Sequence, residues 1–295
     1  MSAITQGSVT ANGVEFAYLT AGDANDWRRP LALCLHGFPD SAHGWRHLLP
    51  ALAEQGYRAV APFQRGYAPT AVPADGRYQS GALAVDAIAL HEVLGANGDA
   101  VIIGHDWGAS GTHGAAVLAP ERWAKVVSMA VPPGPALAMA LLTNLAQVQR
   151  SWYMFFFQHG LADMVVPAND LAFIDLLWSQ WSPGHDATDD LAHVKASLRD
   201  PANLTAALGY YRATLGDGYK DPALAGAQAA TQGWATQPHL YLHGRDDGCI
   251  GVEVAQEAAA MAPANVTVEI IDDAGHFLQL EQPAVVNTRV LRFLS

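Results

Sequence analysis

The sequence predicts an α/β protein with a mostly parallel sheet flanked by helices and a helical cap inserted above the strand ends. Short apolar runs alternate with helical patterns at both ends of the chain, and residues 132–233 are helical and aromatic without a convincing strand. Such alternation is typical of a parallel sheet covered by helices. We therefore expect a core built from residues 1–131 and 234–295, with residues 132–233 as the cap.

The first part of the core is expected to begin with a hairpin. Asn12-Gly13, within residues 9–18, is a strong signal for a two-residue turn between antiparallel strands. After it, short apolar runs predict buried strands and longer periodic stretches predict helices. The expected strands cover residues 31–35, 58–62, 100–104 and 125–131, and the expected helices lie near residues 41–55 and 79–94.

The inserted segment begins where this pattern breaks, at the Pro-Pro-Gly-Pro of residues 132–135. Strand-like runs return at residues 239–243 and 266–271, and an amphipathic helix over residues 284–294 closes the chain. Ligands of open α/β sheets bind at the carboxyl ends of the strands. The cap is therefore expected to cover the functional site.

Composition excludes several classes of protein. A hydrophobic content of 51% with 15% charged residues argues against disorder, and a net charge of −12 argues against nucleic acid or an anionic membrane as partner. The two cysteines, Cys34 and Cys249, indicate neither a disulfide framework nor a thiolate metal site. No signal peptide and no run of membrane-spanning length is visible, so we expect a soluble cytoplasmic protein.

One motif carries most of the functional information. Residues 101–109 read as a short apolar run, a Gly-x-Asp-x-Gly turn and the start of a small-residue helix. This is the strand–turn–helix setting of a nucleophile elbow, with Asp106 in place of the usual serine. The alternative is an aspartate that only caps the following helix.

An aspartate at this position changes the expected chemistry. A serine must lose its proton to a base before it attacks, whereas a carboxylate is already ionised at neutral pH. A carboxylate can attack a saturated carbon directly and form an ester with the enzyme. Asp106 therefore points to epoxide opening or carbon–halogen cleavage rather than acyl transfer.

The remaining members of a catalytic triad follow in the order nucleophile, acid, histidine. His276 lies in a turn directly after a predicted strand, as do the adjacent Asp246 and Asp247. A carboxylate on one ring nitrogen orients a general base and stabilises its imidazolium. Adjacent residues leave a strand in different directions, and of the two acids we favour Asp247.

An oxyanion hole is also required, because water attacking an ester creates a tetrahedral anion. The backbone N–H of Trp107, the residue after the nucleophile, is one expected donor. The other is the N–H of Phe38 in the loop of residues 36–39, where Pro39 favours a rigid turn that could be cis. The alternative for this loop is a turn that merely ends a strand.

The other histidines indicate no metal. His43 and His47 are four residues apart but lack the intervening glutamate and a third ligand. His105 precedes the nucleophile and is expected to support its turn. We expect no metal and no cofactor.

Taken together, residues 36–39, 104–108 and 274–277 resemble the epoxide hydrolase branch of the α/β-hydrolase superfamily. The resemblance covers nearly the whole chain. It implies the α/β-hydrolase fold, and it places the acid as the fourth residue of a Gly-x-x-Asp turn, which is Asp247. One departure is that residues 62–68 keep only the Arg-Gly-Tyr core of the family's usual segment, which leaves the shape of the pocket open.

The same resemblance implies two cap tyrosines that hydrogen-bond the epoxide oxygen. Residues 150–153 match the family's pattern around the first, which gives Tyr153, and residues 210–212 match the second, which gives Tyr211. Phenols are suitable acids for a basic alkoxide, although both could simply pack the cap. We expect the substrate pocket to include His36, Pro39, Trp152 and Phe277.

Two other functions remain open. A haloalkane dehalogenase would use the same Asp106, with the indole of Trp107 holding the halide, but Phe38 supplies no second side-chain donor, so Trp152, Trp178 or Trp181 would have to. A ligand-binding protein without chemistry would not need an intact triad. We expect a small apolar epoxide to be hydrolysed to a vicinal diol, by a protein that is a monomer or a homodimer.

Overall fold

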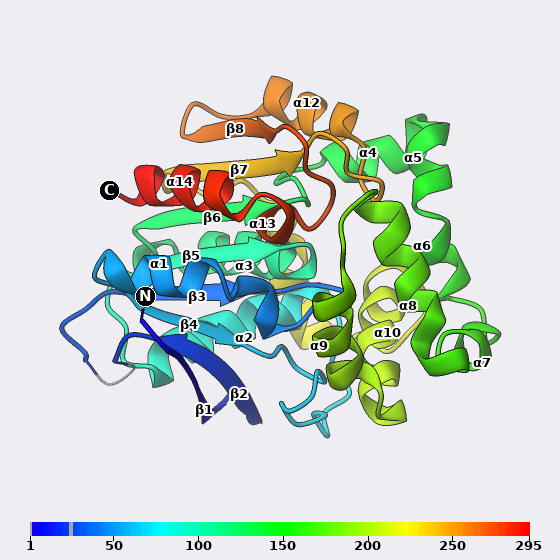
Figure 1. Ribbon diagram of the computed structural model, residues 1–295, viewed down its shortest axis with the longest axis horizontal. Coiled ribbons are helices and arrows are strands. Elements are labelled where there is room, and N and C mark those ends of the chain that lie inside the picture. Colours follow the sequence, from blue (N-terminus) through cyan, green and yellow to red (C-terminus); the bar gives the residue numbers. More distant parts are fainter. Residues whose placement is uncertain (1, 24–25) are drawn as a thin grey trace.

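Within the described residues, 2–23 and 26–295, eight strands form one twisted sheet in the computed structural model (Figure 1). The strand order is β1-β2-β4-β3-β5-β6-β7-β8. β2 runs antiparallel to β1 and to β4, and the pairs from β4 to β8 are parallel. The strands are β1 (Ile4–Ala11), β2 (Val14–Ala21), β3 (Leu31–Leu35), β4 (Arg58–Pro62), β5 (Val101–His105), β6 (Lys125–Met129), β7 (His239–Gly244) and β8 (Val266–Ile271).

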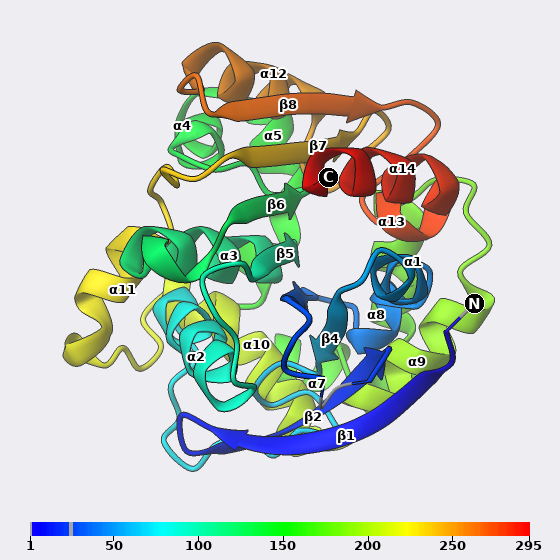
Figure 2. The ribbon, with the colours of Figure 1, turned by 90° about the vertical axis from the view of Figure 1, so that its left-hand side faces the viewer.

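Helices cover both faces of this sheet (Figure 2). The central strands β3, β4 and β5 are buried along their whole length, which explains why they are short apolar runs rather than alternating ones. One face carries α2 (Ser80–Val93) and α3 (Trp107–Leu118), and the other carries α1 (Leu48–Glu54) and α14 (Pro283–Leu294). Shorter or peripheral elements are η1 (Ala42–Trp45), η2 (Pro120–Arg122), α12 (Val252–Met261) and α13 (Leu278–Glu281).

The segment between β6 and β7 is helical and lies beyond the carboxyl ends of the strands (Figure 1). We use "cap helices" for α5 to α10. Of the two helices that flank them, α4 (Ala136–Thr143) packs both on α5 and on α12 of the core, and α11 (Ala225–Ala230) packs on α2 and α3 of the core. The other elements here are α5 (Leu145–Arg150), α6 (Trp152–Phe156), α7 (Ala162–Val165), α8 (Ala168–Trp181), α9 (Thr188–Leu198), α10 (Pro201–Leu215) and η3 (Pro222–Leu224).

The predicted fold class is confirmed, and the elements differ from expectation in detail. The expected helix near residues 41–55 is two pieces, η1 and α1. The strand expected over residues 125–131 ends at Met129, because Ala130 has a left-handed backbone (φ 65°) that turns the chain out of the sheet.

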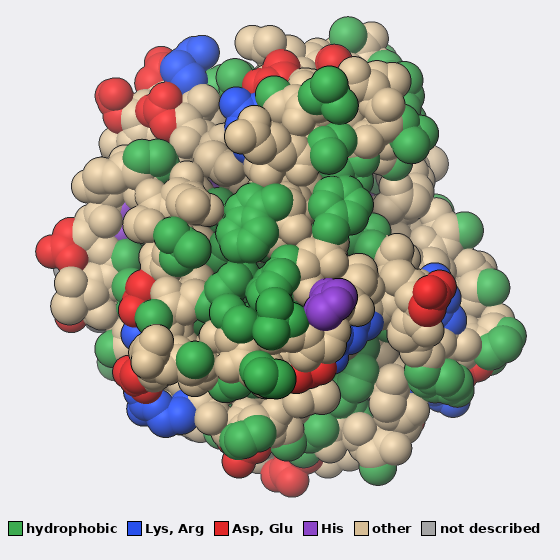
Figure 3. All heavy atoms as spheres, turned by 90° about the vertical axis from the view of Figure 1, so that its right-hand side faces the viewer, with side chains coloured by type: hydrophobic (Ala, Val, Ile, Leu, Met, Phe, Trp, Pro, Cys, Tyr) green, Lys and Arg blue, Asp and Glu red, His purple; other side chains and the backbone are tan. Residues whose placement is uncertain are grey.

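The outer face of the cap helices is rich in exposed apolar side chains (Figure 3). Leu145 of α5 and Met164 of α7 are among the most exposed of these, and Leu142 of the flanking helix α4 is exposed as well. Among the described helices, none combines the length and the hydropathy that crossing a bilayer requires.

Candidate active site

Asp106 occupies a sharp turn between β5 and α3. Its backbone lies at φ 54° and ψ −119°, a strained conformation for a residue with a side chain. A Cβ atom at Gly104 would overlap the carbonyl oxygen of Gly108, and one at Gly108 would overlap the carbonyl oxygen of Leu35. The two glycines are therefore needed for the close approach of strand and helix.

The loop after β3 meets this turn directly. The backbone N–H of Phe38 donates to Oδ1 of Asp106 at 2.8 Å, and the Phe38–Pro39 peptide bond is cis. A Cβ at Gly37 would overlap the Asp106 side chain, so glycine is required there too. Trp107 is the first residue of α3, so its N–H has no partner within the helix. One backbone donor thus contacts the Asp106 carboxylate, and the N–H of Trp107, unpaired within α3, follows Asp106 directly in the chain.

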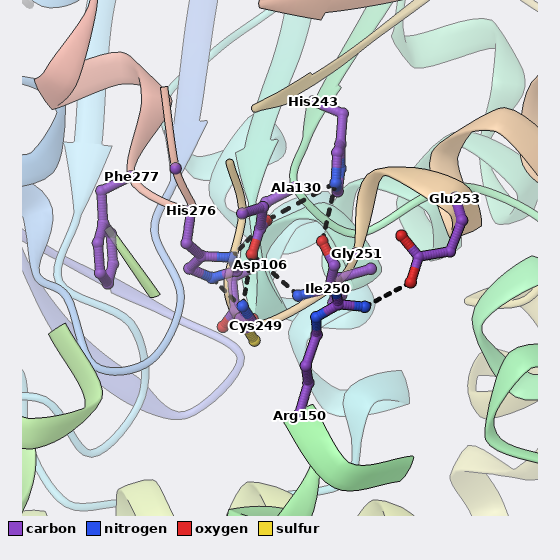
Figure 4. Close-up of polar contacts among 12 residues, drawn as sticks. Asp106, Ala130, Arg150, His243, Cys249, Ile250, Gly251, Glu253, His276 and Phe277 are labelled. Atoms are coloured by element: carbon purple, nitrogen blue, oxygen red, sulfur yellow. Dashed lines mark hydrogen bonds and ion pairs between the residues drawn. The ribbon is translucent and has the colours of Figure 1, made fainter. Parts of the chain in front are cut away.

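His276 lies between two carboxylates (Figure 4). Its Nδ1 is 2.9 Å from Oδ2 of Asp247, and its Nε2 is 3.7 Å from Oδ2 of Asp106. Asp247 is buried, and its other oxygen accepts the N–H groups of Cys249 (2.7 Å) and Ile250 (2.9 Å). Asp246, the alternative acid, is exposed to solvent.

This arrangement sets the charge of the triad. Burial by itself would lower the pKa of His276, but the carboxylates of Asp247 and Asp106 outweigh it and raise the pKa to about 10. Burial works against ionisation of Asp247, yet the attraction of His276 and the hydrogen bonds it accepts leave its pKa below the usual value. The resting site therefore holds an imidazolium between two carboxylates.

The cap helices bring two buried phenols over this site. Tyr153 and Tyr211 pack edge to face with ring centroids 5.6 Å apart, and burial and the nearby Asp106 charge raise the pKa of each well above its ordinary value. The hydroxyl of Tyr211 is buried with no hydrogen-bond partner among the described residues. The adjacent Tyr210 donates instead to the carbonyl of Arg65 at 2.8 Å. The two neighbouring tyrosines therefore have different surroundings.

Comparison with known proteins places these features in a family. The family model for the α/β-hydrolase fold matches residues 30–283. Epoxide hydrolase A of Mycobacterium tuberculosis is 30% identical, covering 100% of this chain and 98% of that protein. The chain belongs to the epoxide hydrolase branch of the α/β-hydrolase fold family. The resemblance inferred from the motifs is thereby confirmed.

Solved structures agree with this assignment. Epoxide hydrolase A of Mycobacterium thermoresistibile superposes with a TM-score of 0.77 at 27% identity, covering 99% of this chain and 98% of that one. A variant of an epoxide hydrolase from Bacillus megaterium, in complex with its naphthyloxy-propanediol product, superposes with a TM-score of 0.79 at 25% identity. The superposition covers 98% of this chain and 99% of that one.

One polar contact in this α/β-hydrolase was not predicted. The Sγ atom of Cys249 lies 3.3 Å from the hydroxyl of Tyr153. The only signal in the sequence is that Cys249 follows Asp247 by two residues. The same short turn therefore holds the acid beside His276 and contacts a tyrosine of the cap.

A cavity of about 110 Å³ opens beside the nucleophile of this α/β-hydrolase. Asp106, Trp107 and Tyr211 border it, together with apolar and polar side chains of five other segments. The remaining lining residues are Ser80, Ser110, His113, Val131, Pro132, Gly134, Leu137, Ala138, Leu141, Met154, Thr214, Leu215, Thr231, Gln232 and Ile250.

The four side chains expected in the substrate pocket do not border this cavity. His36 is buried, with its Nε2 accepting the N–H of Gln64 at 3.0 Å. The carbonyl of Pro39 accepts the indole N–H of Trp178 at 2.8 Å, and Phe277 stacks on that indole at 3.6 Å. His36, Pro39 and Phe277 therefore pack within the protein around the site and do not line the cavity.

Trp152 lies on the outer side of the cap. It is 36% exposed and packs on Phe156 and Phe173. Successive residues of a helix point about 100° apart, so Trp152 faces outward where Tyr153 faces inward.

Three potential metal ligands lie close together, and two of them are paired with each other. Donor atoms of Asp247, Cys249 and His276 lie within 4.8 Å of one another. The carboxylate and the imidazole are paired with each other, and burial raises the pKa of the Cys249 thiol well above its ordinary value. His43, the other histidine considered, stacks on His193 at 3.8 Å.

Proposed function

We propose that this protein hydrolyses epoxides to vicinal diols through a covalent ester on Asp106. The observation that carries the proposal is the position of the Asp106 carboxylate. It receives the N–H of Phe38 on one side and faces Nε2 of His276 on another, with the phenol of Tyr211 bordering the same cavity. The epoxide hydrolase names of the relatives and the diol product of the Bacillus megaterium enzyme support the same reaction.

In the first step, an oxygen of Asp106 forms a bond to an epoxide carbon as the ring C–O bond breaks. The bonding electrons go to the ring oxygen, which takes a proton from Tyr153 or Tyr211. Both phenols remain protonated in the resting site because their pKa values are raised. The product of this step is a hydroxyalkyl ester on Asp106.

Ester formation also prepares the second step. It removes the carboxylate charge of Asp106, one of the two charges that raise the pKa of His276. His276 can then give up its proton, which balances the proton lost by the tyrosine. A neutral imidazole is the form that can act as a general base.

In the second step, Nε2 of His276 takes a proton from water, whose oxygen attacks the ester carbonyl. The N–H groups of Phe38 and Trp107 would hold the resulting oxyanion. The intermediate collapses by breaking the bond between the carbonyl carbon and the bridging ester oxygen, which came from Asp106. That oxygen leaves on the substrate carbon with the remaining proton of the added water, whose own oxygen stays in the carboxylate. The diol, the Asp106 carboxylate and the His276 imidazolium result.

Haloalkane dehalogenation is the second candidate function, and one observation favours it. The indole Nε1 of Trp107 is buried without a hydrogen-bond partner and could hold a halide. Of the three proposed second donors, the N–H of Trp178 is engaged by Pro39 and Trp152 faces away from the cavity. This leaves Trp181, whose ring lies 5.0 Å from that of His276. The unpaired hydroxyl of Tyr211 suits a developing alkoxide better than a departing halide.

Trapping of the ester tests the proposal. His276→Gln is exposed to styrene oxide or, separately, to 1-bromobutane, and its intact mass is recorded. We expect Asp106 to carry the full mass of styrene oxide, with the site located by peptide mapping. The double variant His276→Gln/Asp106→Asn is the control and is expected to stay unmodified.

Each other outcome changes the assignment. A butyl adduct alone, with bromide released, would identify a dehalogenase. Adducts located on Cys34 or Cys249 would be stray alkylation. If neither compound modifies Asp106, the proposed nucleophile is wrong.

A further inference from the structure

The cavity extends from the nucleophile along one face of α3. Asp106, Ser110 and His113 all border it, at spacings of four and three residues. Within α3, the three-residue spacing places Ser110 and His113 on one face of the helix. With a rise of about 1.5 Å per residue, His113 lies about 4.5 Å beyond Ser110 along the helix axis, and Asp106 stands at the turn that precedes the helix.

Two sets of side chains line the cavity, and we call them the apolar wall and the polar wall. Apolar side chains of the segment after β6, including Val131, Pro132 and Leu137, form one wall with Met154 of α6. Polar side chains from α2, α3, the end of α10 and the end of α11 form the other. These are Ser80, Ser110, His113, Thr214, Thr231 and Gln232.

Part of the polar wall is already satisfied within the protein. The hydroxyl of Ser80 accepts from Gln228 at 2.7 Å and lies 3.1 Å from that of Thr231. The hydroxyl of Thr214 accepts the backbone N–H of Ser80 at 3.1 Å. These three groups form a closed network.

The rest of the polar wall is free to bind a ligand. Ser110 is half-buried and Gln232 is exposed, and the side chain of neither makes a hydrogen bond within the described part of the chain. His113 is 1% exposed, and its Nε2 is also without a partner. Buried polar groups are normally paired, so the unpaired Nε2 of His113 suggests that a ligand pairs it, and Ser110 and Gln232 offer further hydrogen-bonding groups along the same cavity.

The charge of these groups limits what the ligand can carry. Among the lining residues, Asp106 is the sole Lys, Arg, Asp or Glu. Burial lowers the pKa of His113 well below its ordinary value, so its imidazole is neutral. A charged substituent would be desolvated here without a counter-charge.

We propose that the preferred substrates are epoxides whose ring is joined, through an apolar chain, to a neutral hydrogen-bonding group such as a hydroxyl. The chain would lie on the wall of Val131 and Leu137, and the polar group would reach Ser110 and Gln232. This inference rests on the proposed epoxide hydrolysis and adds the class of substrate.

Two matched pairs of substrates test it: 1,2-epoxyhexane with 5,6-epoxyhexan-1-ol, and 1,2-epoxyoctane with 7,8-epoxyoctan-1-ol. The kcat/KM of each is measured for the wild type, Ser110→Ala and Gln232→Leu. Alanine is the best helix former, so Ser110→Ala is not expected to disturb α3. Ser179→Ala, at an exposed position of α8, is the matched control.

We expect Ser110→Ala or Gln232→Leu to lower kcat/KM for a hydroxylated member about three- to tenfold relative to its alkyl partner, the range of one neutral hydrogen bond. Ser179→Ala should leave the ratio unchanged. If both cavity variants alter the two members of each pair equally, or not at all, the inference is overturned while epoxide hydrolysis stands. If the wild type hydrolyses none of the four compounds, the proposed function falls and this inference falls with it.

Discussion

The Nε2 atom of His276 lies 3.7 Å from Oδ2 of Asp106, while the opposite ring nitrogen contacts Asp247. His276 thus interacts with the carboxylate of Asp106, which is expected to become an ester during the reaction, and with the carboxylate of Asp247, which stays ionised. The charge on His276 is therefore linked both to the stability of the fold and to the progress of the reaction.

The stability contributed by His276 should depend on pH in a defined window. Its folded pKa of about 10 is higher than its ordinary value of 6.5. A group whose pKa is raised by folding stabilises the protein fully when the pH lies below its pKa in the unfolded chain. This stabilisation is lost as the pH rises through its pKa in the folded protein. We expect the free energy of unfolding of the wild type to exceed that of His276→Gln by the largest amount below pH 6.5. The gap should narrow by at most about 1.4 kcal/mol per pH unit toward pH 10.

Denaturant unfolding of both proteins at several pH values in this window measures the gap. Titrating groups remote from His276 are shared and cancel in the comparison, whereas Asp247 loses its partner in the variant. A gap that stays constant, or widens as the pH rises, would contradict the assigned pKa direction.

Removal of the two phenols should slow ester formation specifically. We expect Tyr153→Phe and Tyr211→Phe each to slow this step at least about tenfold, and the double variant to lose more, because the alkoxide would leave unprotonated. Hydrolysis of the ester should be unaffected. Stopped-flow tryptophan fluorescence can follow the steps, since Trp107 lies 5.0 Å from Tyr211 and Trp181 lies 5.0 Å from His276, measured between ring centroids.

Tyr210→Phe is the matched control for this prediction. Its hydroxyl binds the carbonyl of Arg65 and is not needed for chemistry. We expect normal rates and a loss of about 1 kcal/mol of stability. A slow first step in Tyr210→Phe together with a normal one in Tyr211→Phe would reverse the assignment of the two tyrosines.

The buried pair of Arg65 and Asp86 should be a major determinant of stability. Nε of Arg65 lies 2.5 Å from Oδ2 of Asp86, and the other carboxylate oxygen accepts from Nη2 of Arg65 and from Asn12, each at 2.7 Å. Asp86→Ala would leave the buried guanidinium with only the carboxylate of Asp75, which is 3.4 Å away and partly exposed. We expect it to lower the free energy of unfolding by about 3–5 kcal/mol.

Arg199→Ala provides the comparison at an exposed pair. Arg199 and Asp170 lie 2.9 Å apart, but both are more than half exposed. We expect a change of no more than about 0.5 kcal/mol. Equal losses in the two variants, measured by chemical denaturation, would show that burial does not decide the strength of these pairs.

Features that depend on short stretches of chain were predictable from the sequence. The buried strands were recognised as apolar runs, and the turn at Asp106 was recognised from its two glycines, because backbone geometry there allows few other residues. The loop of residues 36–39 was expected to hold a rigid turn, and the Phe38–Pro39 bond is cis.

Choices between adjacent residues needed more information. Periodicity alone does not say whether Asp246 or Asp247, or Tyr210 or Tyr211, faces the site. The preference for Asp247 and Tyr211 leaned on the family resemblance. In the structure, Asp247 is buried against His276 and Tyr211 borders the cavity, whereas Asp246 is exposed and Tyr210 binds Arg65.

The sequence by itself determined the order of strands and helices, the turn that holds Asp106 and the family, because these follow from local backbone geometry and short motifs. Only the tertiary structure decided what lies around the site: the contact of Cys249 with Tyr153, the outward position of Trp152, and the free polar groups at Ser110 and Gln232. Such contacts join segments far apart in the chain. They depend on how whole helices pack, which no short stretch of sequence specifies.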